Sequence, residues 1–223
     1  MKRTSRKPSK LSSSLQRHLN AYALAASAAG VGVLALAQPA EAKIVYIPAH
    51  HVFYPGNGTY NLDLNHDGIV DFQLNWVDDS SVLSLWLGRE GKNQMVGYHD
   101  RTNSWASALP SGVRVSTDRP FLPESGGMFD GHCSNSCYSI GPWVGVQNRY
   151  LGLKFYVKGE PHYGWARLST TPVHNPRPIL TGYAYETIPN KAIITGKTKG
   201  RDVITLAPGN LGALAAGHRG RSH

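Results

Sequence analysis

The amino-acid sequence predicts an all-β protein: an antiparallel, jelly-roll-like β-sandwich with long loops. After residue 43, Val, Thr, Tyr and Trp recur in short runs in which apolar residues alternate with polar ones, as in half-buried strands. Clusters of Gly, Pro, Asn, Asp and Ser separate these runs. Helical periodicity is hard to find in the same region. We therefore expect roughly eight or more short strands joined by turns.

The N-terminal region differs from this strand-rich centre. Residues 1–20 carry six Lys and Arg side chains, residues 21–37 form an uncharged run of small and apolar residues, and an A-x-A site ends at Ala42. This order is typical of a secretory signal peptide. We predict that residues 1–42 are a signal peptide cleaved before Lys43, and that the protein is exported. An uncleaved membrane anchor is the alternative.

The net charge is concentrated at the two ends of the chain. The formal charge is +9, yet residues 43–196 hold 12 basic and 12 acidic side chains. We predict that residues 43–196 form the β-sandwich domain, and that residues 197–223 are a basic, Gly- and Ala-rich tail, either disordered or a degenerate sorting segment. Because the central domain is close to neutral, nucleic acid is not an expected partner. No stable membrane span is expected after signal cleavage.

Alternation and turn residues predict the positions of the strands. A first strand begins at Lys43 and should end at Pro48, since proline cannot donate to a ladder. The clearest signal is an antiparallel hairpin whose strands are separated by a Lys-Gly-Glu-Pro turn, with one face in water. The other strands follow from the same pattern. In chain order the expected strands are 43–47, 60–62, 72–76, 82–87, 94–98, 112–116, 150–157, 162–168, 179–186 and 192–195.

The loop between the second and third strands has the pattern D-x-N-x-D-G-x-x-D. Calcium takes about six to eight oxygen ligands, and this spacing directs several side-chain oxygens into one tight turn. The flanking residues alternate as strands do, and position 12 is Leu74 instead of the EF-hand glutamate. We predict a structural calcium ion at the tip of a β-hairpin; a metal-free turn is the alternative. The predicted ligands are Asp63, Asn65, Asp67, Asp71 and the carbonyl of Ile69, with Gly68 permitting the turn.

This loop resembles the Asp-rich calcium loops of FG-GAP (integrin-type) repeats, and its first half is similar to an EF-hand or dockerin loop. The resemblance covers about a dozen residues around the motif. It implies a calcium-binding role for the loop and nothing about the rest of the chain.

Two cysteines, Cys133 and Cys137, lie close together in the segment GHCSNSCYS. In an exported protein such a pair is expected to form a disulfide that closes a small loop. The alternatives are a metal site that includes His132, and a redox pair. The C-x-x-x-C spacing differs from the redox motif C-x-x-C, and no second pair completes a zinc site.

Catalytic motifs are not found in the sequence. It contains no G-x-S-x-G, no phosphate-binding glycine loop, no dinucleotide fingerprint and no H-E-x-x-H. Four glutamates offer carboxylates for glycoside hydrolysis, but sequence places no two of them together. The last of these, Glu186, is expected to bind Arg167. An enzymatic activity is therefore not our leading expectation.

Tryptophans suggest a second class of function. Sugar-binding sandwiches stack aromatic rings on sugars. Trp76, Trp86 and Trp165 fall in strand patterns and are expected in the core. Trp105 and Trp143 lie among Ser, Asn, Gly and Pro residues, so they are the candidates for an exposed glycan-binding surface.

The segment YLGLKFYVKGEPHYGWARL, followed by LTGYAYETIPNKAIITGK, resembles a signature of exported bacterial proteins that often carry a PEP-CTERM-type sorting tail. That signature has the form GW-x-x-[LV] … I-x-x-[YW]-A-Y-E. The resemblance implies export and this architecture without an established activity. In the tail, Ala207-Pro208-Gly209-Asn210 replaces Pro-Glu-Pro. The matching residues are Gly164, Trp165, Leu168, Gly182, Tyr183, Ala184, Tyr185 and Glu186.

The leading expectation for function is an exported, non-catalytic β-sandwich protein with a structural or surface role, stabilised by calcium. The alternative is a calcium-dependent carbohydrate-binding module, whose partner would be a glycan or a cell-surface component. A glycan-active enzyme comes third.

Cleavage of the signal peptide can be tested directly. We expect protein recovered from the native host to begin at Lys43, because the A-x-A site ends at Ala42. Intact-mass spectrometry of the mature pool measures this. A mature pool that retains Met1 or Lys2 at its N-terminus would rule the cleavage out.

Overall fold

A computed structural model describes residues 43–54, 58–79, 82–133, 136–171, 177–199 and 201–206, without the side chains of the two cysteines. The predicted signal peptide and most of the predicted tail lie outside these residues. The described part of the chain contains strands and no helix. It therefore also contains no helix long and apolar enough to cross a membrane.

Fifteen strands make up the described structure. The strands are β1 (Ile44–Val52), β2 (Thr59–Leu62), β3 (Phe72–Asp78), β4 (Val82–Arg89), β5 (Gln94–His99), β6 (Ser104–Ala106), β7 (Arg114–Val115), β8 (Phe121–Leu122), β9 (Gly126–Cys133), β10 (Cys137–Ile140), β11 (Arg149–Val157), β12 (Glu160–Ser169), β13 (Ile179–Glu186), β14 (Ile193–Ile194) and β15 (Val203–Thr205). Ten of them overlap the ten expected strands, whereas β6, β8, β9, β10 and β15 were not expected.

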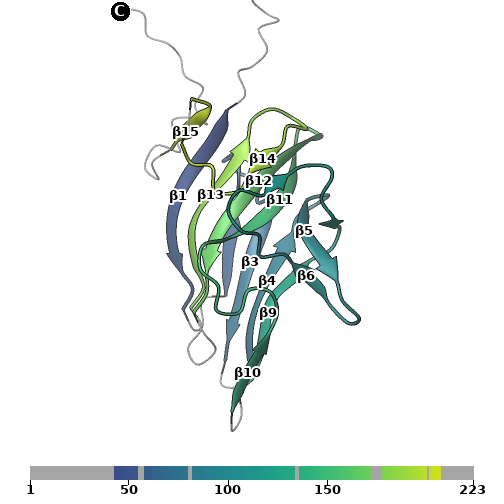
Figure 1. The fold of residues 1–223 in the computed structure, drawn as a ribbon, viewed down its shortest axis with the longest axis vertical. Helices are drawn as coiled ribbons and strands as arrows, with labels where there is room; N and C mark the ends of the chain where they lie inside the picture. The colour runs from purple at the N-terminus through teal and green to yellow at the C-terminus, as the bar shows by residue number, and fades with distance from the viewer. Residues whose placement is uncertain are drawn as a thin grey trace, which may run out of the picture. The chain divides into compact units, whose positions relative to one another are not determined.

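Thirteen of these strands form one large sheet (Figure 1). Its order is β15-β1-β13-β12-β11-β5-β6-β9-β4-β3-β2, with β10 beside β9 and β8 beside β5. The pairs β1–β15 and β6–β9 are parallel. The other paired strands of this sheet are antiparallel, and β7 and β14 form a separate small sheet. For the residues that the structure describes, the prediction of an all-β, mainly antiparallel fold is confirmed.

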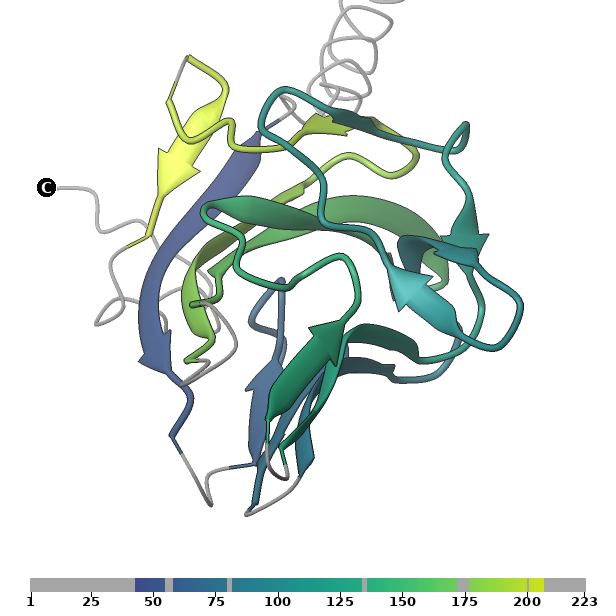
Figure 2. The same cartoon turned by 60° about the horizontal axis from the view of Figure 1, so that its bottom comes forward.

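The large sheet curls so that its two halves face each other (Figure 2). One half contains β1, β13, β12 and β11, and the other contains β2, β3, β4 and β9. Strand β5 joins them, since Met95 pairs with Leu153 of β11 and Gly97 pairs with Ala106 of β6. Alternate residues of each strand point to the same face, so both halves contribute to one hydrophobic core. This core includes Val45, Ile47, Leu74, Trp76, Leu85, Leu87, Phe129, Leu151, Phe155, Leu168 and Leu180.

A second hydrophobic cluster lies on the other face of β11–β13. Tyr163 and Trp165 of β12 pack there with Val115 of β7 and Ile193 of β14. Residues 162–166 are consequently all buried. The prediction that this hairpin keeps one face in water is wrong for β12, because the small β7–β14 sheet and its flanking segments cover that face.

Strand β1 continues past Pro48, where the sequence predicted its end. Proline lacks the N–H group of a ladder bond, so it is tolerated where that side of a strand has no partner. Strand β15 pairs only with residues 44–46 of β1. Pro48 therefore lies beyond the end of the β15 ladder, where no N–H group is needed for a bond to β15. The pairing with β13 shifts register between Pro48 and His51 and then resumes to Val52.

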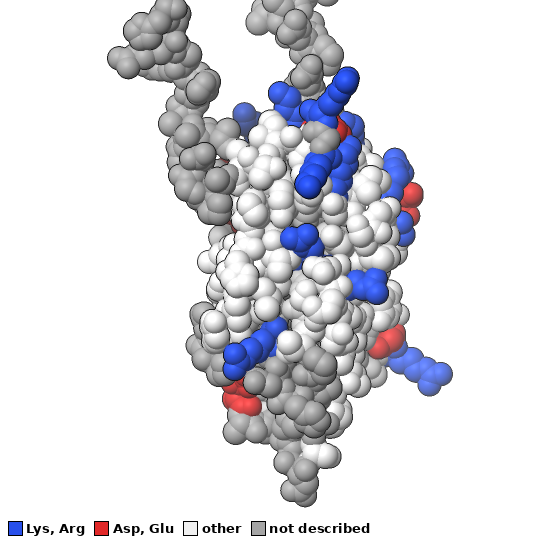
Figure 3. All heavy atoms as spheres, turned by 60° about the vertical axis from the view of Figure 1, so that its left-hand side comes forward, with Lys and Arg blue, Asp and Glu red and all other residues white. Residues whose placement is uncertain are grey.

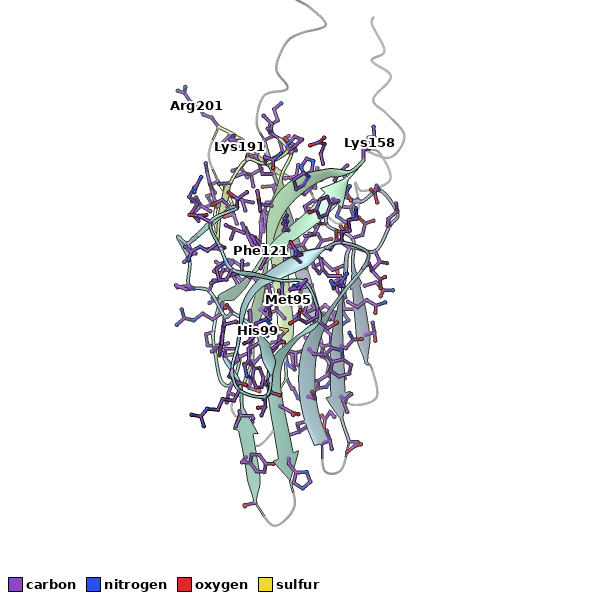
Figure 4. All side chains as sticks on the ribbon, turned by 90° about the vertical axis from the view of Figure 1, so that its right-hand side faces the viewer. Met95, His99, Phe121, Lys158, Lys191 and Arg201 are labelled. Carbon is purple, nitrogen blue, oxygen red and sulfur yellow. The ribbon has the colours of Figure 1, made fainter. Side chains whose placement is uncertain are left out.

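Gly97 occupies the corner where β5 passes from one half of the sheet to the other. A Cβ atom built there would lie 2.4 Å from Leu122 Cδ1 and 2.4 Å from the Trp105 carbonyl oxygen. Real Cβ atoms do not approach other atoms so closely, so only glycine fits without a shift of the neighbouring backbone. Figure 4 shows this region, with Met95 and His99 of β5 and Phe121 of β8 following one another along one side of the domain.

The Gly97→Ala variant should be less stable than the wild type by about 1–3 kcal/mol, because the added methyl group overpacks this corner. Urea unfolding measures the difference. Gly88→Ala is the matched control, since a Cβ on this β4 residue would meet its nearest neighbour, Asn75 Nδ2, at an ordinary 3.4 Å. Equal free energies of unfolding for the two variants would contradict the proposed close packing at β5.

Candidate calcium site

The predicted calcium loop is the connection between β2 and β3. These strands are antiparallel and pair Leu62 with Phe72, so residues 63–71 form the tip of a hairpin, as expected. Leu74, at position 12 of the motif, is fully buried in β3 and offers no ligand. The loop is therefore held between two strands whose apolar residues belong to the core.

Short hydrogen bonds bring three of the predicted ligands together at the tip. Asp63 Oδ2 accepts a hydrogen bond from the Gly68 N–H at 2.9 Å. Asp67 accepts from the Ile69 N–H and from Asn65 Nδ2, both at 2.9 Å. Gly68 has φ +87°, a conformation that residues with a Cβ rarely adopt, and no atom within 4 Å would meet a side chain there. Backbone conformation therefore explains this glycine, as the motif predicted.

Two side-chain oxygens in the loop are buried without a hydrogen-bond donor. They are Asp63 Oδ1 and Asn65 Oδ1, at positions 1 and 3 of the motif. A buried acceptor without a partner costs free energy, and the cost is greater for a charged group. A cation bound between these oxygens would remove this cost. The donor set at the tip therefore fits a hard cation that prefers oxygen ligands.

Asp71 lies at the base of the loop instead of at its tip. Its side chain is buried, and its Oδ2 accepts from the Leu64 N–H at 2.9 Å. Its Oδ1 accepts from Asn93 Nδ2 at 3.3 Å. In the described part of the chain, no three His, Cys, Asp or Glu side chains are close enough together to hold a metal ion. The structure thus joins Asn65 directly to Asp67 and ties Asp63 to Gly68 of the same tip, but it does not gather the three aspartates around one point.

Ile69, predicted to contribute its carbonyl, is the most exposed large apolar residue described, at 67%. Its N–H is the one that donates to Asp67, so its backbone is part of the tip.

Burial raises the pKa of Asp71 from 3.8 to about 6. The Leu64 N–H and the Asn93 amide oppose this shift, whereas the charges of Asp63 and Asp67 add to it. Since the folded pKa lies above the ordinary value, this group favours the fold below about pH 4, and that contribution is lost as the pH rises through about 6. Above that pH the Asp71 side chain is a buried carboxylate anion, and a bound cation would offset the free-energy cost of its charge.

Asn93 connects the loop to two other elements. Its side-chain amide donates to the Asp71 carbonyl at 3.0 Å and its Oδ1 accepts from the Tyr156 N–H of β11 at 3.2 Å. Its own N–H donates to the Glu90 carbonyl at 3.0 Å. Asn93 is 7% exposed, so these bonds are shielded from water. No local pattern indicated a role for Asn93, because Asp71 and Tyr156, the partners of its side chain, lie far from it along the chain.

A second connection runs from the loop to the opposite half of the sheet. His66 Nε2 lies 3.1 Å from the hydroxyl oxygen of Tyr183 on β13. Burial lowers the pKa of His66, and the charge of Asp63 opposes that shift. The loop is thus tied to both halves of the curled sheet.

Trp105 and Trp143 do not form the exposed sugar-binding surface that the sequence suggested. Trp105 is 5% exposed and donates its indole N–H to Asp100 Oδ2 at 2.6 Å. Trp143 is fully buried and donates to the Ala106 carbonyl at 2.8 Å. Trp105 lies in strand β6, and its ring packs so closely on Gly127 and Gly141 that a Cβ there would lie 3.0 Å and 2.8 Å from it. Trp143 belongs to the hydrophobic core. The polar composition of the neighbouring sequence therefore did not indicate exposure of these rings.

The cysteines face each other across the β9–β10 hairpin. Cys133 and Cys137 are direct backbone partners in this antiparallel pair. Such partners have Cα atoms about 4.5–5.5 Å apart, within the range of a disulfide. Their side chains lie outside the described residues, so the disulfide stays a prediction. The His132 and Tyr138 rings lie 6.1 Å apart at a tilt of 48°. The alternative metal site, like the disulfide, is not tested by the described residues.

Glu186 binds a lysine instead of the expected arginine. It is 2% exposed, and its Oε2 lies 3.3 Å from Lys191 Nζ. Arg167 instead donates to Thr181 Oγ1 at 2.7 Å. The sequence could not distinguish these pairs, because the turn after β13, which brings Lys191 close to Glu186, was not predictable from the alternation pattern.

Basic side chains gather at one end of the domain, the upper end in Figure 3. This end carries the segment after β13. Two of its lysines are paired: Lys191 with Glu186 and Lys197 with Asp202 at 2.5 Å. Acidic partners thus offset part of the positive charge.

Comparison of the chain with protein-family models, with curated proteins and with solved structures gives no match. The resemblance to exported PEP-CTERM-type proteins and the FG-GAP-like character of the loop stay predictions.

The Asn93→Ala variant should lose about 2–4 kcal/mol of stability, because buried groups of Asp71 and Tyr156 lose their partner. Thermal or urea unfolding measures this. Gln73→Ala is the control, since its side-chain amide donates only to Asn61 Oδ1 in an exposed bond of 3.3 Å. A loss for Asn93→Ala no greater than that of the control would show that Asn93 does not anchor the loop.

Proposed function

We propose that this chain is an exported, non-catalytic β-sandwich protein with a structural or surface role, and that calcium bound at residues 63–71 stabilises its fold. The observation that carries the proposal is the pair of buried oxygens without donors, Asp63 Oδ1 and Asn65 Oδ1. The sequence of the N-terminal region and the GW…GYAYE resemblance support export.

Calcium would be held first by Asp63 and Asn65, with Asp67 beside them. The Ile69 carbonyl and Asp71 complete the predicted set. The ion would supply positive charge where three carboxylates lie within one short loop, and so lower their mutual repulsion. The loop belongs to the β2–β3 half of the sheet, and Asn93 and His66 connect it to β11 and β13 of the opposite half, so ordering it would stabilise the whole domain.

The alternative of a calcium-dependent carbohydrate-binding module loses its first candidate surface, since Trp105 and Trp143 are buried. A carbohydrate would have to bind elsewhere on the domain. A glycan-active enzyme would need two carboxylates about 5–10 Å apart across a cleft. The buried Glu186, already bound to Lys191, does not suit that role.

Calcium should raise the melting temperature of the mature protein. Binding to the folded state alone adds about 3 kcal/mol when free calcium is about a hundred times the Kd. Asp67→Ala should abolish the increase, and magnesium should replace calcium poorly because it requires tighter octahedral geometry. Differential scanning calorimetry with calcium, magnesium or chelator measures these effects.

The control is Asp118→Ala, which removes an exposed carboxylate paired with Arg114, away from the loop. This variant should keep the full response to calcium. Identical melting curves in calcium and in chelator, with no ion at the loop in a calcium-soaked crystal, would leave only the metal-free turn.

A further inference from the structure

Two adjoining hollows lie on the sides of the turn between β4 and β5. Their volumes are about 390 Å³ and about 370 Å³, which is within the usual size range of small-ligand sites. Both are lined by Gly91, Lys92 and Tyr156. We call this surface the Tyr156 groove. It is separate from the buried oxygens at the tip of the calcium loop, although Ile69 and Val70 line one end of it.

Tyr156 of β11 lines both hollows. Its backbone N–H is fixed by Asn93 at 3.2 Å. The Lys154 ammonium lies 5.6 Å from the centre of the Tyr156 ring and donates to Gln94 Oε1 at 3.1 Å. An aromatic ring held in this way offers an apolar surface at little entropic cost, and Gln94 adds a hydrogen-bonding group in the second hollow.

Positive charge dominates the rim of the groove. Arg89 and Lys92 line it, and Lys154 lies against its aromatic wall. The Arg89 guanidinium donates to the Gly91 carbonyl, so it is fixed at the turn. Lys158, at the upper end of the domain in Figure 4, precedes Gly159 at the edge of the first hollow. The exposed acidic residue here is Glu90, whereas the carboxylate of Asp71 is buried and hydrogen-bonded.

The lining therefore combines an aromatic ring, apolar contacts and several cations. The apolar contacts come from Ile69 and Val70 in one hollow and from Pro123 in the other. A bare phosphate or sulfate would use the cations but leave the ring and the apolar walls without contacts. A sugar acid matches all three, because its C–H face stacks on an aromatic ring, its hydroxyls form hydrogen bonds and its carboxylate pairs with lysine.

We propose that the Tyr156 groove binds an acidic oligosaccharide, a chain of uronic acid residues that extends over both hollows. One sugar ring stacks on Tyr156, and carboxylates of the chain pair with Lys92 and Lys154. This goes beyond the proposed structural role of the protein. The proposed binding does not require the calcium ion, because Tyr156, Lys92 and Lys154, which would stack on the sugar and pair with its carboxylates, are not predicted calcium ligands. Two predicted calcium ligands, Ile69 and Asp71, line one hollow.

The test is isothermal titration calorimetry of the mature protein with tetragalacturonate, in calcium and again in chelator. Cellotetraose, a neutral chain of the same length, and inorganic phosphate are the comparison ligands. We expect saturable binding of the acidic chain alone, weakened about tenfold or more by Tyr156→Ala and by Lys92→Ala. Salt should weaken the binding because the ion pairs are exposed.

Two control variants match these changes elsewhere on the surface. Tyr138→Ala removes a tyrosine that is 60% exposed on β10, and Arg101→Ala removes an exposed cation of the β5–β6 loop. Both should bind tetragalacturonate as the wild type does. Melting curves of all variants establish that each is folded.

The proposal is overturned if no saturable binding of tetragalacturonate is found, if Tyr156→Ala and Lys92→Ala bind like the folded controls, or if phosphate binds equally well. The calcium proposal is judged separately by melting temperature. Binding that persists in chelator supports the groove even if calcium has no effect on stability.

Discussion

At β5, the backbone and side chains of three strands come into close contact, and this contact determines how the large sheet curls. A single sheet of thirteen strands has one hydrophobic core only if it curls over itself, and β5 is the strand shared by the two halves. At this corner Gly97 lies directly against Leu122 and the Trp105 carbonyl. A side chain there would push β5 away from its neighbours β6 and β8, at the point where the sheet turns. The long antiparallel strands on either side then follow from ordinary apolar alternation.

Asn93 gives the calcium loop and the Tyr156 groove a common support. It lies at the start of β5, between Asp71 at the base of the loop and Tyr156 in the wall of the groove. An amide offers both donors and an acceptor, so a single buried residue can satisfy groups on both sides. Order in the loop and order in the groove are therefore expected to change together, even though the ligands proposed for them differ in chemistry.

Much of the fold could be predicted from the sequence, because alternation is a local signal. Strand β13 has the predicted bounds, and the calcium motif lies at a hairpin tip as expected. Long-range packing was not predictable. The burial of Trp105 and Trp143, the covered face of β12 and the support from Asn93 all depend on segments distant in sequence. The groove was missed for the same reason, since Tyr156 comes from β11 and Lys92 from the turn before β5.

The parallel pairing of β15 with β1 has a mechanical consequence. Strand β15 pairs with β1 through three residue pairs, from Val203 to Thr205; Val203 packs on the second hydrophobic cluster, and Ile204 is 40% exposed. If the chain beyond this strand is attached to a surface, tension reaches the domain first through this short, exposed ladder. Strand β13, by contrast, is paired on both sides and closes the core. Strand β15 would then detach under load while the curled sheet, its loop and its groove stay folded.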